Sequence, residues 1–218
     1  SASDAARSSL MSARLDKLGD GDESRLADAL DDGELSLLTG PFGTALSAKE
    51  YRAEGFPVIH PSNIVGGRLT HRADSFVDTR TWRRLARWQV KAGDIILMRK
   101  GDVGRSAMVT SEEEGWVLGS GCILVRTRGS FNPEYVRAIL GSDANRRELL
   151  RRAPGTTMPG INEKSLRHLR LPRVSSGHQR ALLRDLADVQ KVSESLAAER
   201  RQVQATRKAV LAEVGAAT

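Results

Sequence analysis

Apolar side chains recur at alternating steps of four and three residues along the last part of the chain. From His178 to Val214 the sequence contains neither proline nor glycine, so nothing in it interrupts a helix. The apolar positions of the repeat are Leu182, Leu186, Val189, Leu196, Val203, Val210 and Val214, and its other positions hold Ser193, Arg200 and Arg207. This heptad pattern predicts one long helix with a seam that requires a partner helix.

Two arginines interrupt this predicted seam. Arg200 and Arg207 stand where a self-sufficient coiled coil would carry Ile or Val. In a parallel pair of identical helices, like charges would meet at both positions. In an antiparallel pair, Glu194 or Glu199 could lie opposite the arginines and offset them. We therefore predict antiparallel pairing, with either a second copy of the chain or a helix of a larger assembly.

Before this helix, short apolar runs alternate with glycine- and proline-rich turns. The runs predict strands at 56–60, 94–99, 106–110, 117–125 and 166–172, and helices at 25–30, 79–90, 135–140 and 146–152. The fold class is therefore α+β, a body of short strands and helices followed by a long coiled-coil helix. We expect residues 1–24 to be a helical arm or linker remnant with a helix over 4–18, residues 25–174 to be the body, and residues 175–218 to be the long helix.

Composition adds a class of partner to this picture. The chain has 218 residues, of which 39% are hydrophobic and 4% aromatic, so the body can bury a largely aliphatic core. A net charge of +7 is typical of proteins that bind nucleic acids or anionic surfaces. The single cysteine, Cys122, excludes an internal disulfide and fits a reducing compartment. With no signal peptide and no membrane-spanning apolar run, we expect a cytoplasmic protein.

The positive charge is concentrated in two stretches. Between Arg68 and Arg105 there are ten Lys and Arg residues against four Asp. Arg146, Arg147, Arg151 and Arg152 form a second patch just before a Gly-Thr-Thr loop. Arginine neutralises phosphates and also pairs with guanine edges, and the Ser, Thr, Asn and Gly of the intervening loops can approach DNA closely. The distribution favours a nucleic acid as the partner.

Two short motifs resemble known sites and do not fit their context. Asn132-Pro133-Glu134-Tyr135 is similar to the catalytic loop of amino-methylating DNA methyltransferases, but a helix cap explains these residues and no S-adenosylmethionine-binding loop precedes them. Gly101-Asp102-Val103-Gly104 matches the GXXG loop of KH domains, but its flanks are predicted strands. The second motif is either a turn that needs glycine or a phosphate contact through Lys100 and Arg105, and both interpretations stay open.

No catalytic or metal-binding pattern accompanies these motifs. The four histidines do not have metal-ligand spacing with Cys122 or with one another, and no catalytic triad or phosphate-binding loop is present. We therefore expect no catalysis, no metal and no cofactor in this chain.

A set of weak motifs in a fixed order resembles one protein family. The set comprises Gly40-Pro41-Phe42-Gly43, Gly55-Phe56-Pro57-Val58-Ile59 with Asn63-Ile64, Gly93-Asp94-Ile95-Ile96-Leu97 with the 100–105 turn, Gly155-Thr156-Thr157 with Ile161-Asn162, and Gln179 at the start of the long helix. This order resembles the target recognition domain and spacer helix of type I restriction–modification specificity subunits.

The resemblance implies a non-catalytic protein that reads one half of a bipartite DNA site. The long helix would set the distance to a second recognition domain and dock an adenine-N6 methyltransferase, and S-adenosylmethionine would bind only in that partner. A full specificity subunit has two recognition domains, whereas this chain has one. It is therefore expected to be either a half-subunit that homodimerises or the recognition part of a fused methyltransferase.

From their chemistry we predict which residues contact DNA, and which form the seam. The predicted DNA contacts are Arg68, Arg83, Arg84, Arg87, Lys100, Arg105, Arg151, Thr156 and Thr157. The predicted partner seam is Leu182, Leu186, Val189, Leu196, Arg200, Val203, Arg207 and Val210. Two alternatives of another class remain: an RNA-binding protein, which the low aromatic content disfavours, and a scaffold that does not bind DNA.

Overall fold

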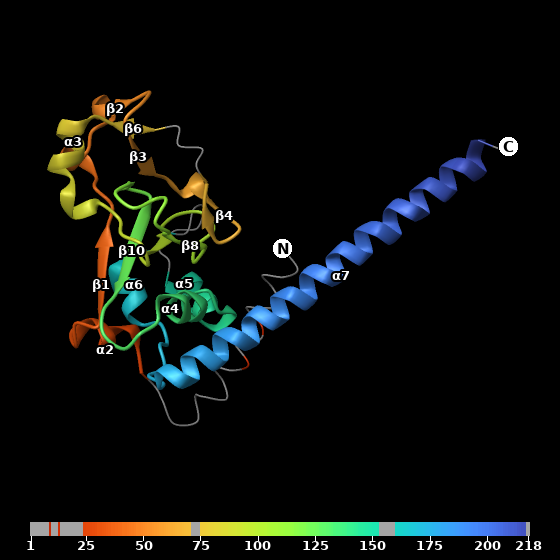
Figure 1. Ribbon diagram of the computed structural model, residues 1–218. Helices are drawn as coiled ribbons and strands as arrows, with labels where there is room; N and C mark the ends of the chain where they lie inside the picture. Colours follow the sequence, from red (N-terminus) through yellow and green to blue (C-terminus); the bar gives the residue numbers. More distant parts are fainter. Residues whose placement is uncertain (1–8, 10–12, 14–23, 71–74, 153–159, 217–218) are drawn as a thin grey trace.

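A computed structural model of the chain describes residues 9, 13, 24–70, 75–152 and 160–216, with side chains as far as residue 207. It consists of a mixed α/β body from which one long helix projects (Figure 1). The α+β fold class and the C-terminal helix are therefore confirmed. The helix expected over 4–18 and the predicted DNA contacts Thr156 and Thr157 lie outside the described residues.

The body is built on two sheets. The first sheet has six strands in the order β1-β10-β7-β8-β5-β4, and the second has four in the order β2-β6-β3-β9. The strands of the first are β1 Leu35–Thr39, β10 Cys122–Thr127, β7 Ile95–Met98, β8 Ser106–Met108, β5 Arg68–Leu69 and β4 Ile64–Val65. Those of the second are β2 Tyr51–Arg52, β6 Phe76–Val77, β3 Phe56–Ile59 and β9 Val117–Leu118.

Successive side chains of the central strands point to opposite faces of the first sheet, which divides the core into two layers. In β7, Ile95 and Leu97 join a cluster formed with the helices α2 Leu26–Asp31, α4 Pro133–Leu140, α5 Asp143–Arg152 and α6 Glu163–Arg167. Ile96 and Met98, on the other face, pack with residues of the second sheet such as Ile59 and Leu118. Both faces of the six-stranded sheet are thus covered, which explains why β7 is apolar throughout.

Close backbone packing joins the two sheets. A Cβ added to Gly40 would lie 1.9 Å from the carbonyl oxygen of Gly119, and one added to Gly119 would lie 2.3 Å from the carbonyl oxygen of Ile59. The Gly-Pro segment after β1 and the link from β9 to β10 therefore require glycine for space. This link also corrects one prediction: residues 117–125 form two strands in different sheets, not one.

Two further segments differ from their predictions. Residues 166–172 do not form a strand. Asn162 caps α6, which extends to Arg167, by accepting a hydrogen bond from the Ser165 backbone N–H at 2.9 Å, and Arg170 then makes an isolated bridge with Arg25 rather than a strand pairing. The segment predicted as one helix over 79–90 divides into α3 Thr79–Arg84 and a 3-10 turn, Ala86–Trp88. This change of winding leaves Ala86 exposed.

The long helix α7, Ser176–Ala216, is anchored to the body by its first turns. Gln179 is buried and makes three hydrogen bonds: its Oε1 accepts from Asn132 N at 2.8 Å, and its Nε2 donates to the carbonyl oxygens of Ser130 and Val174 at 3.1 and 3.0 Å. With a rise of about 1.5 Å per residue, the helix is about 60 Å long. None of the described helices is long and apolar enough to cross a membrane.

Candidate nucleic-acid interface

The turn between β7 and β8 presents Lys100 to solvent. Gly101 and Gly104 have φ values of +82° and +88°, a conformation that side chains other than glycine rarely adopt. Because the flanking elements are strands, the KH interpretation is excluded, and backbone geometry alone accounts for both glycines. The turn is braced by an isolated bridge between Lys100 and Gly160, while the Lys100 side chain stays exposed.

Arg105, at the other end of this turn, points inward. Its guanidinium Nη1 lies 3.9 Å from a carboxylate oxygen of Asp102, and its Nη2 donates to the carbonyl oxygen of Pro61 at 3.5 Å. Asp102 also accepts a hydrogen bond from Arg146 of α5 at 2.5 Å. Arg105 is therefore half-buried and holds the turn against the body, whereas Lys100 is the turn's outward cation.

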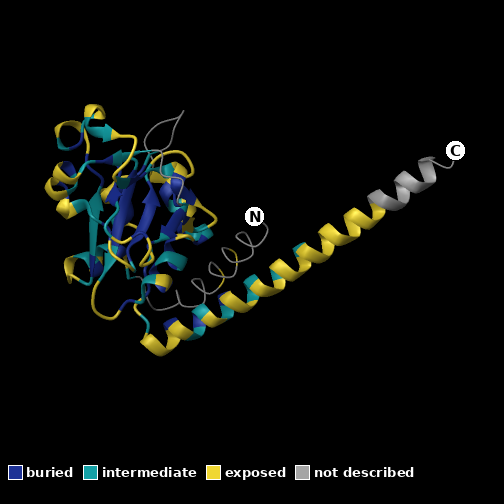
Figure 2. Ribbon diagram, turned by 45° about the horizontal axis from the view of Figure 1, so that its top comes forward, coloured by how far each residue is buried: buried dark blue, intermediate teal, exposed yellow. Residues whose placement is uncertain are grey.

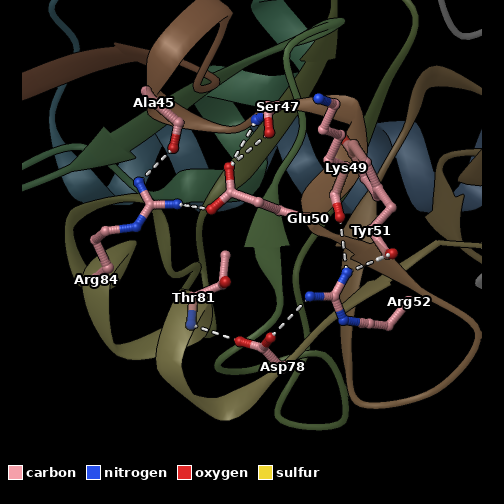
Figure 3. Close-up of polar contacts among 9 residues, drawn as sticks. All are labelled: Ala45, Ser47, Lys49, Glu50, Tyr51, Arg52, Asp78, Thr81 and Arg84. Carbon is pink, nitrogen blue, oxygen red and sulfur yellow. Dashed lines mark hydrogen bonds and ion pairs between the residues drawn. The ribbon is translucent and has the colours of Figure 1, made fainter.

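The helix α3 and the following turn carry three of the predicted DNA contacts. Arg83 is exposed on α3, and the Arg87 guanidinium lies 4.8 Å from the ring centre of Trp88, a cation–π arrangement that fixes its direction. Arg84 instead bonds a carboxylate oxygen of Glu50 and donates to the carbonyl oxygen of Ala45 at 2.7 Å (Figure 3). Arg84 is thus a structural link to the loop before β2, and Arg83 and Arg87 are the outward cations.

Two carboxylates hold α3 and the loop before β2 in place. Backbone hydrogen bonding from Ser47, reinforced by Arg84, holds the pKa of Glu50 below its ordinary value. Asp78 caps α3 by accepting from the Thr81 backbone N–H at 2.8 Å, and this bond lowers the pKa of Asp78 (Figure 3). Both groups are therefore ionised at neutral pH, and each pairs with one arginine: Glu50 with Arg84, and Asp78 with Arg52 at 3.3 Å.

Arg68 lies on the edge hairpin formed by β4 and β5. Its side chain is exposed and lines a groove of about 800 Å³ between this hairpin, α4 and the first turns of α7. Met108 pairs with it on the neighbouring parallel strand β8. The groove also contains Glu112, Glu134 and Arg137, so both signs of charge face it.

Arg151 belongs to α5 and is paired within the helix. It shares the carboxylate of Glu148 with Arg152, and hydrogen bonding from Arg152 holds the pKa of Glu148 below its ordinary value. The predicted cations therefore divide into two groups. Within residues 24–70, 75–152 and 160–207, acidic side chains pair with Arg84, Arg105 and Arg151 but not with Arg68, Arg83, Arg87 or Lys100.

These outward cations do not form one patch. Arg83 and Arg87 lie on the lobe of α3, Lys100 lies on the turn that packs beside α5, and Arg68 lies on the hairpin beside α7 (Figure 1). A ligand that contacts all of them has to extend over several elements of the body. An elongated polyanion meets this requirement better than a compact ligand does.

The predicted seam of α7 is used in two different ways. In the proximal segment, residues 176–190, Leu182 and Leu186 are buried in the body's core with exposed fractions of 8% and 2%, and Val189 is half-buried. In the distal segment, residues 191–216, Leu196 and Val203 are exposed by 55% and 66%. Figure 2 shows that the described residues of this segment are mostly exposed. Arg200 and Arg207 are also exposed, and the side chain of Val210 lies outside the described residues.

The sequence did not reveal the structural contacts of three polar side chains. Asp94 is buried and forms two bonds with Arg126, at 2.7 and 2.6 Å, which raise the pKa of that arginine. Asn145, also buried, bonds the backbone of Arg170. Gln179 anchors α7, as described above. Only Gln179 had a sequence signal, its place at the start of the helix, because the partners of the other two are distant in the chain.

The structure also decides two questions of chemistry. Asn132 accepts hydrogen bonds from Glu134 N and Tyr135 N, and the buried Tyr135 hydroxyl donates to the Pro172 carbonyl oxygen at 2.9 Å, so this motif is a helix cap. Burial raises the pKa of the Cys122 thiol to about 12, which makes it unreactive. Among the described residues, no cluster of His, Cys, Asp and Glu has the arrangement of a metal site.

Comparison with known proteins identifies the fold. No protein-family model and no curated protein sequence matches the chain. A chain from a study of complex assembly and conformational transition in a type I restriction–modification (R-M) system matches with a TM-score of 0.63 and 16% identity, over 82% of this chain and 42% of its own length. The HsdS subunit from Thermoanaerobacter tengcongensis gives 0.56 and 16%, over 79% and 38%.

A third solved structure agrees with these two. The S subunit of the type I restriction–modification system from M. genitalium has a TM-score of 0.50 and 18% identity, over 92% of this chain and 51% of that one. The chain therefore spans about half or less of the length of each neighbour. It has the fold of a target recognition domain followed by a spacer helix, as the order of sequence motifs predicts.

Proposed function

We propose that this chain binds double-stranded DNA in a sequence-specific manner and acts as a specificity half-subunit. The observation that carries the proposal is the set of outward cations without acidic partners among the described residues, Arg68, Arg83, Arg87 and Lys100, on a body with the fold of type I specificity subunits. Their separation over several elements suits the length of a duplex rather than a small anion.

In this proposal the outward cations position the DNA and the loops read it. Lys100, Arg83 and Arg87 contact phosphates and supply sequence-independent affinity. Arg68 stands beside a groove and is exposed, so its guanidinium has access to base edges or to the backbone. The paired residues Arg84, Arg105 and Arg151 hold the surface in shape. Because each is already paired with an acidic side chain, we expect them to contribute less to DNA binding than the outward cations do.

The partner in this proposal is an adenine-N6 DNA methyltransferase, which the chain directs to one half of a bipartite site. Methyl transfer from S-adenosylmethionine belongs to that subunit, and cleavage, where it occurs, to a nuclease subunit. This chain provides one recognition body, so a second body has to come from another copy or from a fused protein.

The distal segment of α7 is the proposed contact between two bodies. Its exposed Leu196 and Val203 provide an apolar seam, and antiparallel pairing brings Glu194 or Glu199 of one helix towards Arg200 or Arg207 of the other. Two bodies would then lie at opposite ends of a rigid spacer and face the same duplex. The helix length of about 60 Å sets the scale of their separation.

Fluorescence anisotropy with labelled duplexes at several salt concentrations tests the DNA-binding proposal. For Arg83→Gln with Lys100→Gln, affinity should fall for every sequence, and the slope of log K against log salt should fall by roughly 2, about 0.9 for each lost phosphate contact. Arg184→Gln with Arg201→Gln on α7 is the charge-matched control and should change neither quantity.

Three outcomes count against the proposal. Absence of salt-dependent duplex binding by the wild type indicates a scaffold that does not bind DNA. Displacement of the duplex by single-stranded RNA at equal concentration indicates an RNA-binding protein. Equal salt slopes for the double variant and the control remove the assigned phosphate contacts.

A further inference from the structure

A pocket on the helical side of the body collects arginines from three distant parts of the sequence. It has a volume of about 460 Å³ and lies between α5, the residue that precedes α2, and the segment that follows α6. The charged and titratable side chains that line it are Arg25, Arg147, Glu148, Arg151, His168 and Arg170. Apart from Arg151, none of these is among the DNA contacts predicted from the sequence.

The floor of this pocket is fixed by backbone hydrogen bonds. Arg25 and Arg170 face each other in an isolated antiparallel bridge, and next to it Leu26 N donates to the Leu169 carbonyl oxygen at 2.9 Å. Asn145 is 1% exposed; its Nδ2 donates to the Arg170 carbonyl oxygen and its Oδ1 accepts from Arg170 N, both at 2.9 Å. The arginines therefore project from a rigid base, so an anion has little backbone to order when it binds.

Among the described residues, arginine is the prevailing charged side chain of this pocket. Four of these lining residues are arginines and one is a glutamate, Glu148, which also pairs with Arg152 outside the lining. Arg151 is partly neutralised by Glu148, whereas Arg147 is exposed and has no acidic partner among the described residues. The Arg25 guanidinium is oriented by donating to the His168 carbonyl oxygen at 3.0 Å.

We infer that this pocket binds a phosphate group, held by the guanidinium groups of Arg25, Arg147 and Arg170. Arginine forms paired, charge-assisted hydrogen bonds with phosphate oxygens, and several guanidinium groups around one pocket suit the three acceptor oxygens of a phosphate better than the two of a carboxylate. The phosphate belongs either to the DNA backbone or to a small phosphate-bearing molecule. Assignment to a phosphate of the DNA backbone rests on the proposed function. In that case DNA would also contact the side of α5 that faces away from the Lys100 turn.

Two measurements on the full chain distinguish these sources. Titration with inorganic phosphate at constant ionic strength, followed through the arginine Nε–H resonances by NMR, reports the pocket directly. Anisotropy with a short labelled duplex reports DNA binding. The test variant is Arg25→Gln, Arg147→Gln, Arg170→Gln, and the charge-matched control is Arg180→Gln, Arg184→Gln, Arg201→Gln on α7.

The two readouts separate the outcomes. Loss of the phosphate-dependent shifts together with at least a tenfold loss of DNA affinity, in the test variant only, assigns the pocket to backbone phosphate. Loss of the shifts with unchanged DNA affinity assigns it to a small phosphate-bearing ligand. Absence of phosphate-dependent shifts in the wild type overturns the inference, even where DNA binding, and with it the proposed function, persists.

A gain-of-binding variant guards against misfolding as an explanation. Glu148→Gln removes the one carboxylate among the described residues that line the pocket, and it releases Arg151 and Arg152 from their ion pairs. Phosphate affinity should rise several-fold in this variant, because electrostatic repulsion is removed and a guanidinium is gained. An unchanged or lower affinity contradicts the assignment of the pocket as a phosphate site.

Discussion

The proximal and distal segments of α7 share one heptad repeat and have opposite surroundings. Leu186, in the proximal segment, is 2% exposed because it packs into the core between the helices of the body. Val203, in the distal segment, is 66% exposed. The repeat therefore identifies an apolar stripe without revealing what covers it. In the proximal segment the chain's own body does so, and in the distal segment we propose that a second helix does.

The largest difference between the segments should appear in stability. Leu186→Ala should lower the free energy of unfolding by about 2–5 kcal/mol, because it removes a buried side chain and leaves a cavity. Leu196→Ala, the matched change in the distal segment, should alter it by less than about 0.5 kcal/mol in dilute solution. Urea unfolding followed by tryptophan fluorescence measures both, and equal effects would refute the division of the helix.

Self-association should depend on the distal segment of α7 rather than on the proximal one. Leu196→Asp with Val203→Asp should weaken dimerisation roughly a hundredfold, since two carboxylates would be buried in an apolar seam. The melting temperature of the body should stay unchanged. Ala198→Asp with Ala205→Asp places the same charges on the opposite side of the helix and serves as the control in sedimentation equilibrium. If the two double variants dimerise equally, the seam does not mediate pairing.

Removal of the polar anchor should have an intermediate effect. Gln179→Ala should cost about 1–3 kcal/mol of unfolding free energy, because Asn132 N and two carbonyl oxygens lose a buried partner. Gln202→Ala, at an exposed position of the distal segment, should have no measurable effect. Hydrogen exchange should also show faster opening of residues 176–182 in the first variant, and an unchanged exchange rate there would count against the anchor.

The smallest effect concerns acid sensitivity. Glu50 has a pKa below its ordinary value of 4.5 in the folded chain, so its contribution to stability is present above that value and is lost as pH falls through the folded pKa. Glu50→Gln should therefore cost about 0.5 kcal/mol at pH 7, the scale of an exposed ion pair, and progressively less as pH falls through the folded pKa towards pH 3. Glu199→Gln in the distal segment should change stability at neither pH. A constant difference between pH 7 and pH 3 would contradict the Glu50–Arg84 link.

Local patterns predicted the elements whose determinants lie close together in the sequence. The helix cap at Asn132, the glycine turn at 101–104 and the length of α7 all follow from residues within a few positions of one another. The break between β9 and β10 does not, because Gly119 is required there by the Ile59 carbonyl oxygen of a distant strand. Residues 166–172 were assigned to a strand because their apolar content hid the cap formed by Asn162.

The candidate interface was predictable only in part for the same reason. Residue type identified Lys100 and Arg83 as cations, and the structure leaves both exposed. It could not identify the partners of Arg84 and Arg105, since Glu50 and Pro61 come from other segments. The arginine pocket was hidden altogether, because Arg25 and Arg170 meet only through the fold. Long-range pairing, rather than residue type, decides which cations face an external ligand.

Selection from a library of random-sequence duplexes tests whether two paired bodies recognise a specific DNA sequence. The wild-type chain is incubated with the library, bound duplexes are sequenced, and the enriched sequences are compared with those from Leu196→Asp with Val203→Asp. We expect one enriched motif for both proteins. For the wild type we also expect a second copy of that motif, in inverted orientation and at a fixed spacing. Binding without any enriched motif would contradict sequence-specific recognition.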